Sequence, residues 1–474
     1  MEKIRLLLLS LAVWGATAGP ARPAAAEEAP RGATIEERLD ALDQRQRVLE
    51  RNRELDQEAA QERAKSAIIA GAGKDGFILK SADGSFQLKV GGFVHADGRF
   101  FLDDEQKPAT NQFLIRRAFL NFEGTVNRIF VFRIQPDFGG GKTTLQDAYL
   151  DARFAPAIQL LVGKTKTPFL LERLQSATDR RFVELAFPNS LSPNRDIGAF
   201  LHGDLFNDTV SYAAGVFNGL PDGDSSDGDI ADDKDGAARI FVRPFRNTGI
   251  EPLEGLGLGI AATYGNQEGK VDAAKRSVTS NLPAYKTSGQ NTFFSYRSGV
   301  DSGDFSPDNN VIADGNRTRI SPQAYYYRGP FGLLGEYVRN RQEVRRNSDV
   351  AALTNSAWQA AAHYVLTGEK NSFKHINPAR PFDPSKRQFG ALELAARYSE
   401  LRLDNDAFPR YADPARSASR AKAWTAGLNW YLTRNVKVAA NYEQTRFKGG
   451  AGSAGAIRDR ETEKAVLSRF EVAF

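Results

Sequence analysis

Hydrophobic and polar positions alternate with a period of two along most of the chain from Ser85 to the C-terminus. The pattern is clear in residues 130–137, 147–154 and 424–432, and each such segment is about ten residues long. The polar face is rich in Gly, Asn and charged residues, which is typical of strands with lipid on one side and water on the other. Because an open sheet edge in lipid would leave backbone groups unpaired, the pattern predicts a closed barrel.

Sixteen alternating segments can be counted. They begin near Phe86, Phe113, Ile129, Leu145, Ile158, Arg195, Thr209, Ala237, Leu256, Thr318, Phe331, Asn355, Gly390, Ala421, Val436 and Lys464. Short connections mostly alternate with long ones, as expected for periplasmic turns and external loops. The predicted fold class is therefore all-β, a 16-stranded antiparallel transmembrane β-barrel with an N-terminal helical or coiled-coil extension.

The two chain ends indicate the compartment. Lys3 and Arg5 precede an apolar stretch over residues 4–18, and Ala24, Ala25 and Ala26 supply the small residues of a cleavage site. Residues 1–26 are thus predicted to be a signal peptide. The alternative, an uncleaved anchor, is less favoured because the stretch is short for a span of roughly 20 residues. The last strand ends in Phe474, which resembles the signal for outer-membrane assembly, so a Gram-negative outer membrane is the expected location.

Residues 27–75 have a different pattern. Thr34 and Glu37 have the spacing of a capping box, and a helix is predicted to about residue 65. Coiled-coil spacing follows in Ile35, Leu39, Leu42, Gln46 and Leu49, although a surface helix could show the same pattern over two turns. Residues 67–76 are predicted to be a flexible link. The predicted domains are therefore the signal, residues 27–75 as periplasmic helix and linker, and residues 76–474 as the barrel.

Residue composition limits the kinds of site and activity that the chain can have. The chain carries a net charge of +5, of which residues 1–26 contribute +2, residues 27–75 contribute −3 and the predicted barrel contributes +6. This basic surplus permits an anion site. The absence of cysteine excludes disulfides and Cys-based metal or thiol chemistry. The four histidines are scattered, and the glycine run at residues 139–143 lacks the spacing of a phosphate-binding loop, so no enzyme, cofactor, metal site or nucleic-acid partner is predicted.

Four segments resemble the phosphate- and polyphosphate-selective porins: residues 113–124 (FLIRRAFLNFEG), 218–245 with an Asp-rich middle, 319–337 (RISPQAYYYRGPFGLLGEY) and 377–399 (NPARPFDPSKRQFGALELAARYS). The likeness covers nearly all of the predicted barrel. It implies a homotrimer of sixteen-stranded barrels, each with a pore that infolded loops constrict and that arginines and lysines line. Outer-membrane lipid and lipopolysaccharide are the expected surroundings.

The residues themselves support an anion path. A guanidinium is permanently charged, and its fork matches phosphate oxygens. The candidate pore-lining residues are Arg116, Arg117, Arg133, Lys164, Arg173, Arg180, Arg181, Arg239, Arg243 and Arg319. Alternation sends only one of Arg116 and Arg117 inward unless a bulge intervenes, and the neighbours favour Arg117, although the family resemblance keeps Arg116 as a candidate. For each of these cations, a structural or rim salt bridge is the alternative.

Two connections are candidates for the constriction. Residues 164–195 contain six bases and three acids, with Phe169, Leu170, Leu171 and Leu174 available to hold the loop against the wall. Arg117, Arg133, Arg180 and Arg181 are predicted near the narrowest part of the path. The second candidate is the periplasmic connection of residues 367–389. In the external Asp-rich loop, the acidic residues resemble a calcium loop only weakly, and a solvated or lipopolysaccharide-bridging loop is the preferred interpretation.

The sequence therefore predicts an anion-selective outer-membrane porin that passes phosphate or polyphosphate by passive diffusion. Two alternatives stay open. A general or carboxylate-selective porin would use the same barrel, because fold does not determine the solute. A structural envelope tether would use the N-terminal helix instead, with the pore incidental.

Overall fold

The computed structural model describes residues 34–73, 76–105, 109–229, 232–272, 274–299, 309–453 and 455–474. The chain divides into two compact units, Met1–Ala67 and Ile68–Phe474. The predicted signal peptide and its cleavage site lie outside the described residues. None of the described helices is long and apolar enough to cross a membrane.

The first unit contains one long helix, α1 (Ile35–Ser66). Its capping box forms as the spacing predicts: the Thr34 amide donates to Glu37 Oε2 at 2.9 Å, and the Glu37 amide donates to Thr34 Oγ1 at 3.4 Å. The apolar positions Ile35, Leu39 and Leu42 are all exposed in the single chain. A helix that leaves its apolar seam uncovered is marginal alone, so the coiled coil stays a prediction that a second copy of the helix would satisfy.

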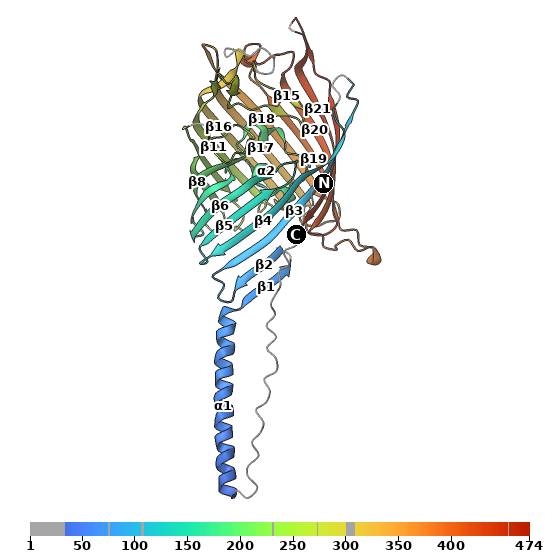
Figure 1. The fold of residues 1–474 in the computed structure, drawn as a ribbon. Helices are drawn as coiled ribbons and strands as arrows, with labels where there is room; N and C mark the ends of the chain where they lie inside the picture. The colour runs from blue at the N-terminus through green and yellow to red at the C-terminus, as the bar shows by residue number, and fades with distance from the viewer. Residues whose placement is uncertain are drawn as a thin grey trace, which may run out of the picture. The chain divides into compact units, whose positions relative to one another are not determined.

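The second unit is a closed antiparallel barrel (Figure 1). Strand β23 pairs with β3, from Lys464↔Leu102 to Ala473↔Phe93, so the sheet has no open edge in the wall. The predicted sixteen-stranded fold is confirmed. The wall strands are β3 (Gln87–Leu102), β4 (Gln112–Val126), β5 (Phe130–Asp137), β6 (Thr144–Ala155), β7 (Ile158–Lys166), β8 (Arg195–Leu205), β9 (Val210–Phe217), β10 (Asp235–Val242), β11 (Leu256–Glu268), β16 (Val311–Arg328), β17 (Phe331–Arg346), β18 (Asp349–Val365), β19 (Ala391–Arg402), β20 (Ala418–Tyr431), β21 (Val436–Ser453) and β23 (Glu463–Ala473).

Fourteen of these strands begin within three residues of the predicted position, and two begin earlier. Strand β16 starts at Val311 and not near Thr318, and β18 starts at Asp349 and not near Asn355. In both strands the extra residues lie at the end where the long loops are. The extra residues, 311–317 and 349–354, do not alternate between apolar and polar, so a period of two does not detect them.

Residues 67–76, predicted as a flexible link, are largely ordered as a strand. Strand β1 (Ile68–Gly73) pairs with β2 (Gly76–Ser81) from Ile68↔Ser81 to Gly73↔Gly76, and β2 continues the pairing onto β3. The small residues of the Gly-Ala run gave no alternation to detect. Their backbone groups still pair, because strand pairing depends on the backbone and needs no particular side chain.

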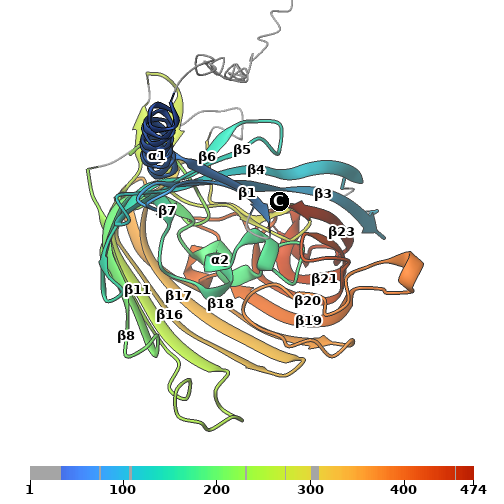
Figure 2. The same cartoon turned by 90° about the horizontal axis from the view of Figure 1, so that it is seen from below.

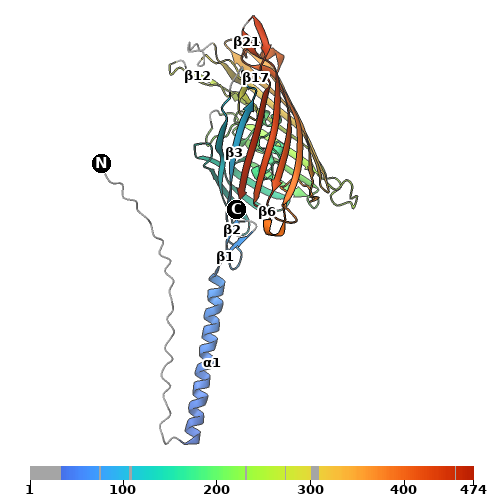
Figure 3. The same cartoon turned by 90° about the vertical axis from the view of Figure 1, so that its right-hand side faces the viewer.

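The wall of the barrel differs in height around its circumference. Strands β5, β9 and β10 have 8 residues each and β7 has 9, whereas β16, β17, β18 and β21 have 16 to 18. Strands β16 to β21 are together called the tall wall below, and Figure 3 shows β17 and β21 side-on. Shorter elements sit in the connections: α2 (Leu171–Leu174), η1 (Ala177–Asp179), η2 (Phe187–Leu191), β12 (Lys270–Asp272), β13 (Ser277–Thr279), β14 (Tyr285–Lys286), β15 (Thr292–Phe294), η4 (Pro384–Lys386), η5 (Asn405–Ala407) and β22 (Ala456–Asp459).

The connection of residues 167–194, called the inner loop below, lies inside the barrel, where Figure 2 shows α2 within the ring of strands. Phe169, Leu170 and Leu191 are fully buried. They pack in one apolar cluster with tall-wall residues such as Val338 and Leu401. Burial of this apolar surface holds the inner loop on the side of the tall wall.

Candidate functional site

Polar contacts anchor the inner loop to the tall wall. Glu336 of β17 accepts hydrogen bonds from the backbone amides of Leu171 at 2.7 Å and Glu172 at 3.3 Å. The Glu172 carboxylate in turn accepts from Gln359 at 3.0 Å and from Arg397 at 3.2 Å. These groups are buried, so each unmade bond would cost the full desolvation of a polar group. The inner loop is therefore fixed on this side by paired groups.

Arg181 is the most heavily paired cation of the inner loop. Its Nε forms an ion pair with Glu393 at 3.1 Å, and its Nη2 donates to Asn371 Oδ1 and to the carbonyls of Ser372 and Lys374. The carboxylate of Glu393 keeps the pKa of Arg181 above the usual range although burial opposes it. Arg181 was predicted near the narrowest part of the path, but its charge is used to hold the inner loop.

Residues 366–390, the long connection at the turn end of the barrel, also contact the inner loop. Gln175 Nε2 donates to the Phe373 carbonyl at 2.9 Å, and the His375 amide donates to Asp179 Oδ1 at 3.0 Å. Burial raises the pKa of Asp179, but hydrogen bonds from His375 outweigh it and leave the pKa below the usual range. Both segments predicted to constrict the path thus meet inside the barrel.

A cavity of about 1030 Å³ lies on the opposite side of the inner loop. Its walls come from β3 to β9, from Ala473 of β23 and from the inner loop itself, and among the described residues none of the lining belongs to the wall strands β10, β11 or β16 to β21. Lys286 and Gln290 line it at the loop end, and Arg434 and Asn435 line it at the turn end. The cavity therefore extends along the barrel from one end to the other.

Cations outnumber carboxylates on its lining. The basic residues are Lys89, Arg116, Arg117, Arg133, Lys166, Arg173, Arg180, Arg195, Lys286 and Arg434, and the acidic side chains are Glu123, Asp137, Asp147, Glu184, Asp204 and Asp222. Each of these carboxylates already has partners. Asp147 pairs with Arg195 at 2.7 Å, and Asp137 accepts from two backbone amides. The acids thus neutralise only part of the positive charge.

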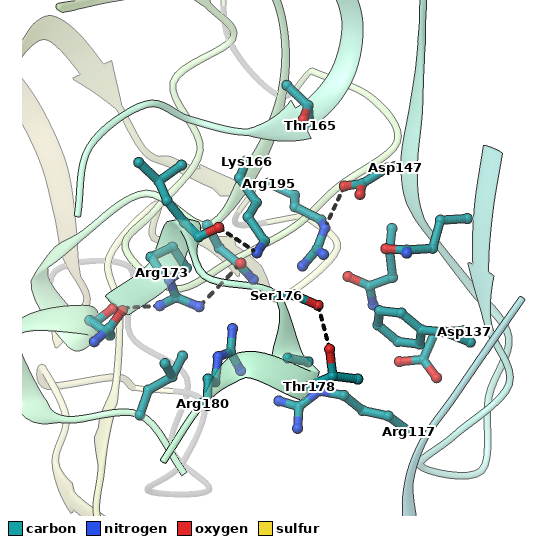
Figure 4. A pocket seen from close by; sticks show the side chains of 18 of the residues that line it. Arg117, Asp137, Asp147, Thr165, Lys166, Arg173, Ser176, Thr178, Arg180 and Arg195 are labelled. Carbon is teal, nitrogen blue, oxygen red and sulfur yellow. Dashed lines mark hydrogen bonds and ion pairs between the residues drawn. The ribbon is translucent and has the colours of Figure 1, made fainter. Parts of the chain in front are cut away.

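Four lining cations grouped around Ser176 and Thr178 form no ion pair with any described residue: Arg117, Lys166, Arg173 and Arg180, together called the cationic cluster. Lys166 donates only to backbone carbonyls, including Gln175 O at 2.6 Å, and Arg173 donates to Asn189 O and Asn194 Oδ1. Nη1 of Arg117 and Nε of Arg180 are buried without a hydrogen-bond partner. Figure 4 shows the four side chains around Ser176 and Thr178, whose hydroxyls lie 2.9 Å apart.

Burial makes the positive charge of the cationic cluster costly. Burial and the positive charges of Arg180 and Arg195 lower the pKa of Arg173 to about 9. Burial, with a smaller contribution from Arg195, lowers the pKa of Arg180 to about 10, although Glu172 opposes the shift. Both guanidinium groups therefore remain cationic at neutral pH. An approaching anion stabilises buried cations that no carboxylate compensates.

A β-bulge decides the orientation of Arg116 and Arg117. His95 of β3 pairs with Arg117, but the next residue, Ala96, pairs with Ile115, so Arg116 occupies the bulge. The bulge lets two consecutive side chains face the same side, and both arginines line the cavity. Simple alternation favoured Arg117 alone. Arg116 forms an ion pair with Glu184 of the inner loop at 2.8 Å.

Glu184 links the two sides of the barrel interior. Its carboxylate accepts from Arg116 at 2.8 Å and from Arg99 at 3.0 Å. Burial alone would raise the pKa of Glu184, but the charges of Arg116 and Arg117 outweigh burial and hold it far below the usual range. The inner loop is therefore tied to β3 and β4 by a carboxylate that stays ionised.

The other predicted wall residues separate into two groups. Arg133 lines the cavity, paired with Glu123 at 2.8 Å. Lys164 shares the outward face of β7 with Leu160 and Val162, and its Nζ reaches Asp227 of the Asp-rich loop at 2.6 Å. Lys164 is not part of the described cavity lining, because alternation along β7 turns it away from the lumen.

Three predicted arginines lie on the inward side of the wall but are not part of the described cavity lining: Arg239, Arg243 and Arg319. Arg319 is fully buried and ion-paired with Asp222 and Asp235. Arg239 donates to Gln323 and lies 4.8 Å from the centre of the Phe241 ring. Arg243 donates to Ser211 Oγ, and none of the three appears on the described lining. For Arg319 the salt-bridge alternative holds, because the Asp-rich loop folds back onto it.

The candidate list omitted Lys166, Arg195, Ser176 and Thr178, which line the cavity. Lys166 ends β7, and Arg195 begins β8. At these positions the chain leaves the regular strand, so period two no longer specifies which side a residue faces. The excess of bases over acids between residues 164 and 195 was the available signal, and it did not distinguish one base from another.

Comparisons with known proteins agree with this architecture. The family model described as phosphate-selective porin O and P matches residues 88–474. The chain is similar to Porin O of Pseudomonas aeruginosa, with 25% identity over 417 residues that cover 79% of this chain and 86% of the relative.

Solved structures with a similar fold include OmpT, an outer membrane protein of Vibrio cholerae, with TM-score 0.49 and 11% identity over 82% of this chain and 98% of OmpT. The Salmonella typhi OmpF complex with daunomycin has TM-score 0.48 and 11% identity over 82% of this chain and 98% of that one. Pseudomonas putida OprB has TM-score 0.47 and 10% identity over 83% of this chain and 95% of OprB.

Proposed function

The chain belongs to the phosphate-selective porin O and P family, and from this premise we propose that its pore favours anions, with phosphate-like species as the principal solutes. The protein is a porin of the Gram-negative outer membrane. Its solute and the residues that select the solute are the subject of the proposal.

The cationic cluster carries the proposal. Arg117, Lys166, Arg173 and Arg180 face one cavity without a paired carboxylate among the described residues. Rings or ladders of Arg and Lys favour anions in a water-filled pore. The carboxylates on the same lining are ion-paired or hydrogen-bonded to other groups, so they compensate only part of this charge.

The kind of anion follows from the donors. Four cations around one space attract a dianion about twice as strongly as a monoanion at equal distance, because Coulomb energy scales with charge. Guanidinium forks and the hydroxyls of Ser176 and Thr178 suit the several oxygens of a phosphate. Residues such as Lys286 and Arg434 nearer the two ends would act as weaker sites in series, which lets a solute leave as well as enter.

Planar-bilayer recording of the purified protein tests the proposal. We expect the reversal potential in a salt gradient to show anion preference, and phosphate to block chloride current in a saturable manner. A cation-selective reversal potential would refute the anion path. Equal block by phosphate and by a monocarboxylate such as acetate would favour a general or carboxylate-selective porin.

The homotrimer is a further part of the proposal. The exposed apolar seam of α1 fits association of helices from several copies. Native mass spectrometry of detergent extracts should give three chains per particle, and a single-barrel mass would contradict this. The tether alternative predicts instead that deletion of residues 27–70 weakens the cell envelope and leaves solute uptake unchanged.

A further inference from the structure

The outward face of the tall wall carries a band of positive charge that the pore does not use. A row of aromatic residues, Tyr337, Trp358, Tyr398, Trp424 and Tyr442, crosses β17 to β21, with Trp358 and Tyr398 ring centres 5.3 Å apart and Trp424 and Tyr442 5.2 Å apart. Such rows mark the border between hydrocarbon and headgroups. Beyond it, toward the loop end, lie the six residues called the basic belt: Arg339, Arg402, Arg420, Lys422, Arg446 and Lys448.

Strand register makes the basic belt continuous. Arg339 is opposite Ser356, Ser356 is opposite Arg402, Arg402 is opposite Arg420, and Arg420 is opposite Lys448. One line of neighbouring positions thus crosses five strands, roughly 19 Å at the usual spacing between strands. Lys422 and Arg446 form a second opposed pair, one step closer to the aromatic row.

Little negative charge compensates the belt. Arg402 is paired with Glu400 at 2.6 Å, whereas the other five cations form no ion pair with any described residue. Like charges directly opposite each other on one face of a sheet are destabilising. Two such contacts, Arg420 with Lys448 and Lys422 with Arg446, join cations without an ion pair among the described residues, and an external polyanion that bridges them would relieve the repulsion.

The position of the belt specifies its ligand. Below the aromatic row the same face exposes apolar side chains such as Leu333, Leu394 and Leu428. The cations lie two to six residues beyond the row along their strands, or roughly 7 to 20 Å. A ligand that fits both zones has acyl chains at the level of the leucines and phosphates at the level of the cations. A second copy of this face is a poor occupant, because the two belts would repel each other.

We propose that the basic belt is a docking surface for the phosphorylated lipid A of lipopolysaccharide. Long loops face the cell exterior in outer-membrane barrels, so the belt lies in the outer leaflet. A lipid with more than one phosphate on a broad sugar headgroup can reach several strands at once, which a single-phosphate phospholipid cannot. Charge-assisted hydrogen bonds from guanidinium groups to phosphate oxygens supply the binding. This surface is separate from the cavity, so it does not depend on the proposed solute.

The test uses the full-length protein in detergent and native mass spectrometry with bis-phosphorylated lipid A as the probe. The variant R420Q/K422Q/R446Q/K448Q removes four charges of the belt. A matched variant, K370Q/R380Q/K386Q/R387Q, removes four exposed charges from residues 366–390 at the turn end. We expect the belt variant to bind lipid A at least tenfold more weakly than the wild type, and the matched variant to stay within twofold.

Several outcomes would overturn the proposal. Equal binding of lipid A by the belt variant and the wild type would remove the site. Equal binding of dephosphorylated lipid A, or of phosphatidylglycerol, by the wild type would show that the belt does not recognise lipid A phosphates. Heat-modifiable migration and chloride conductance report that the variants are folded. If the fourfold variant does not fold, K422Q/R446Q alone should still weaken binding by about threefold.

Discussion

Arg180 and Arg181 are consecutive residues of the inner loop, and they face two different environments. On the side of Arg181, the inner loop meets the tall wall, where the guanidinium pairs with Glu393 and with the segment around Asn371. On the side of Arg180, the inner loop borders the cavity, and the guanidinium has no ion-pair partner in the described structure. Both side chains are at most 7% exposed, so burial does not distinguish them.

What distinguishes the two sides is whether buried charge is compensated within the chain. A buried cation that is paired and hydrogen-bonded holds a structure in place, whereas removal of one partner leaves an uncompensated charge. A buried cation left unpaired costs stability and attracts an external anion. The inner loop thus combines a rigid face that positions it with a charged face that is available to a solute.

The largest loss of stability is expected when an ion pair between the inner loop and the tall wall is removed. The substitution Arg181→Ala leaves Glu393 buried without its ion pair, which costs about 3–5 kcal/mol. We expect a clear loss in the free energy of unfolding of the barrel, together with unstable current levels as the inner loop detaches. The double variant R181A/E393Q removes both charges and should recover part of this loss. A single variant as stable as the wild type would show that the pair does not hold the inner loop.

Next in size is the substitution Glu184→Gln, which weakens the contact of the inner loop with β3 and β4. The loss of charge-assisted bonds to Arg99 and Arg116 should cost about 2 kcal/mol at pH 7. Because its pKa is depressed in the folded protein, Glu184 contributes stability that is fully present above its unfolded pKa of about 4.5 and is lost as pH falls further. The stability difference between the wild type and E184Q should therefore shrink below about pH 4.5. Chemical unfolding at several pH values measures this, and a pH-independent difference would contradict the assignment.

A smaller and selective effect is expected from Arg180→Ala on the charged face. Phosphate should block chloride current about tenfold less effectively, equivalent to about 1.4 kcal/mol. Stability should not fall, since the lost group has no ion pair to break. Arg345→Ala is the matched control, because Arg345 lies at the loop end of β17, pairs with Asp314 and does not line the described cavity. If R180A and R345A behave alike, Arg180 is not part of the anion site.

The smallest effect concerns the hydroxyls between the cations. The double variant S176A/T178A removes neutral hydrogen-bond donors and leaves the charge of the cavity unchanged. Each neutral hydrogen bond contributes about 1 kcal/mol or less, so phosphate block should weaken by about two- to fivefold while the reversal potential stays unchanged. A shift in the reversal potential would mean that the variant disturbs the positions of the cations.

Several features of the fold could be predicted from local pattern. Alternation with period two gave sixteen strands and the class of barrel, because every wall strand has one face in lipid and one in the interior. Thr34 and Glu37 predicted the start of α1 from a contact within one helical turn. Strands β16 and β18 begin earlier than predicted because their first residues do not alternate between apolar and polar, so the pattern gave no signal there.

For the candidate site, the sequence predicted which kinds of residue are present but not which way each side chain faces. Period two predicted that Arg133 faces inward, but it could not reveal the bulge that turns both Arg116 and Arg117 to the cavity. Lys164 and Lys166 both belong to β7 and have similar sequence surroundings, yet only Lys166, the last residue of the strand, lines the described cavity. A one-residue change in register exchanges the faces of a strand, so a single irregularity is enough to reverse such an assignment.

The sequence by itself determined the closed barrel, the period of its wall and the excess of bases near the inner loop, since these depend on neighbours along the chain. Only the tertiary structure decided which bases remain unpaired. Arg319 is neutralised by Asp222 and Asp235, which lie 97 and 84 residues away in the chain, whereas Arg180 meets no such partner among the described residues. Pairing between distant residues depends on how the loops fold back onto the wall, and no local pattern encodes that geometry.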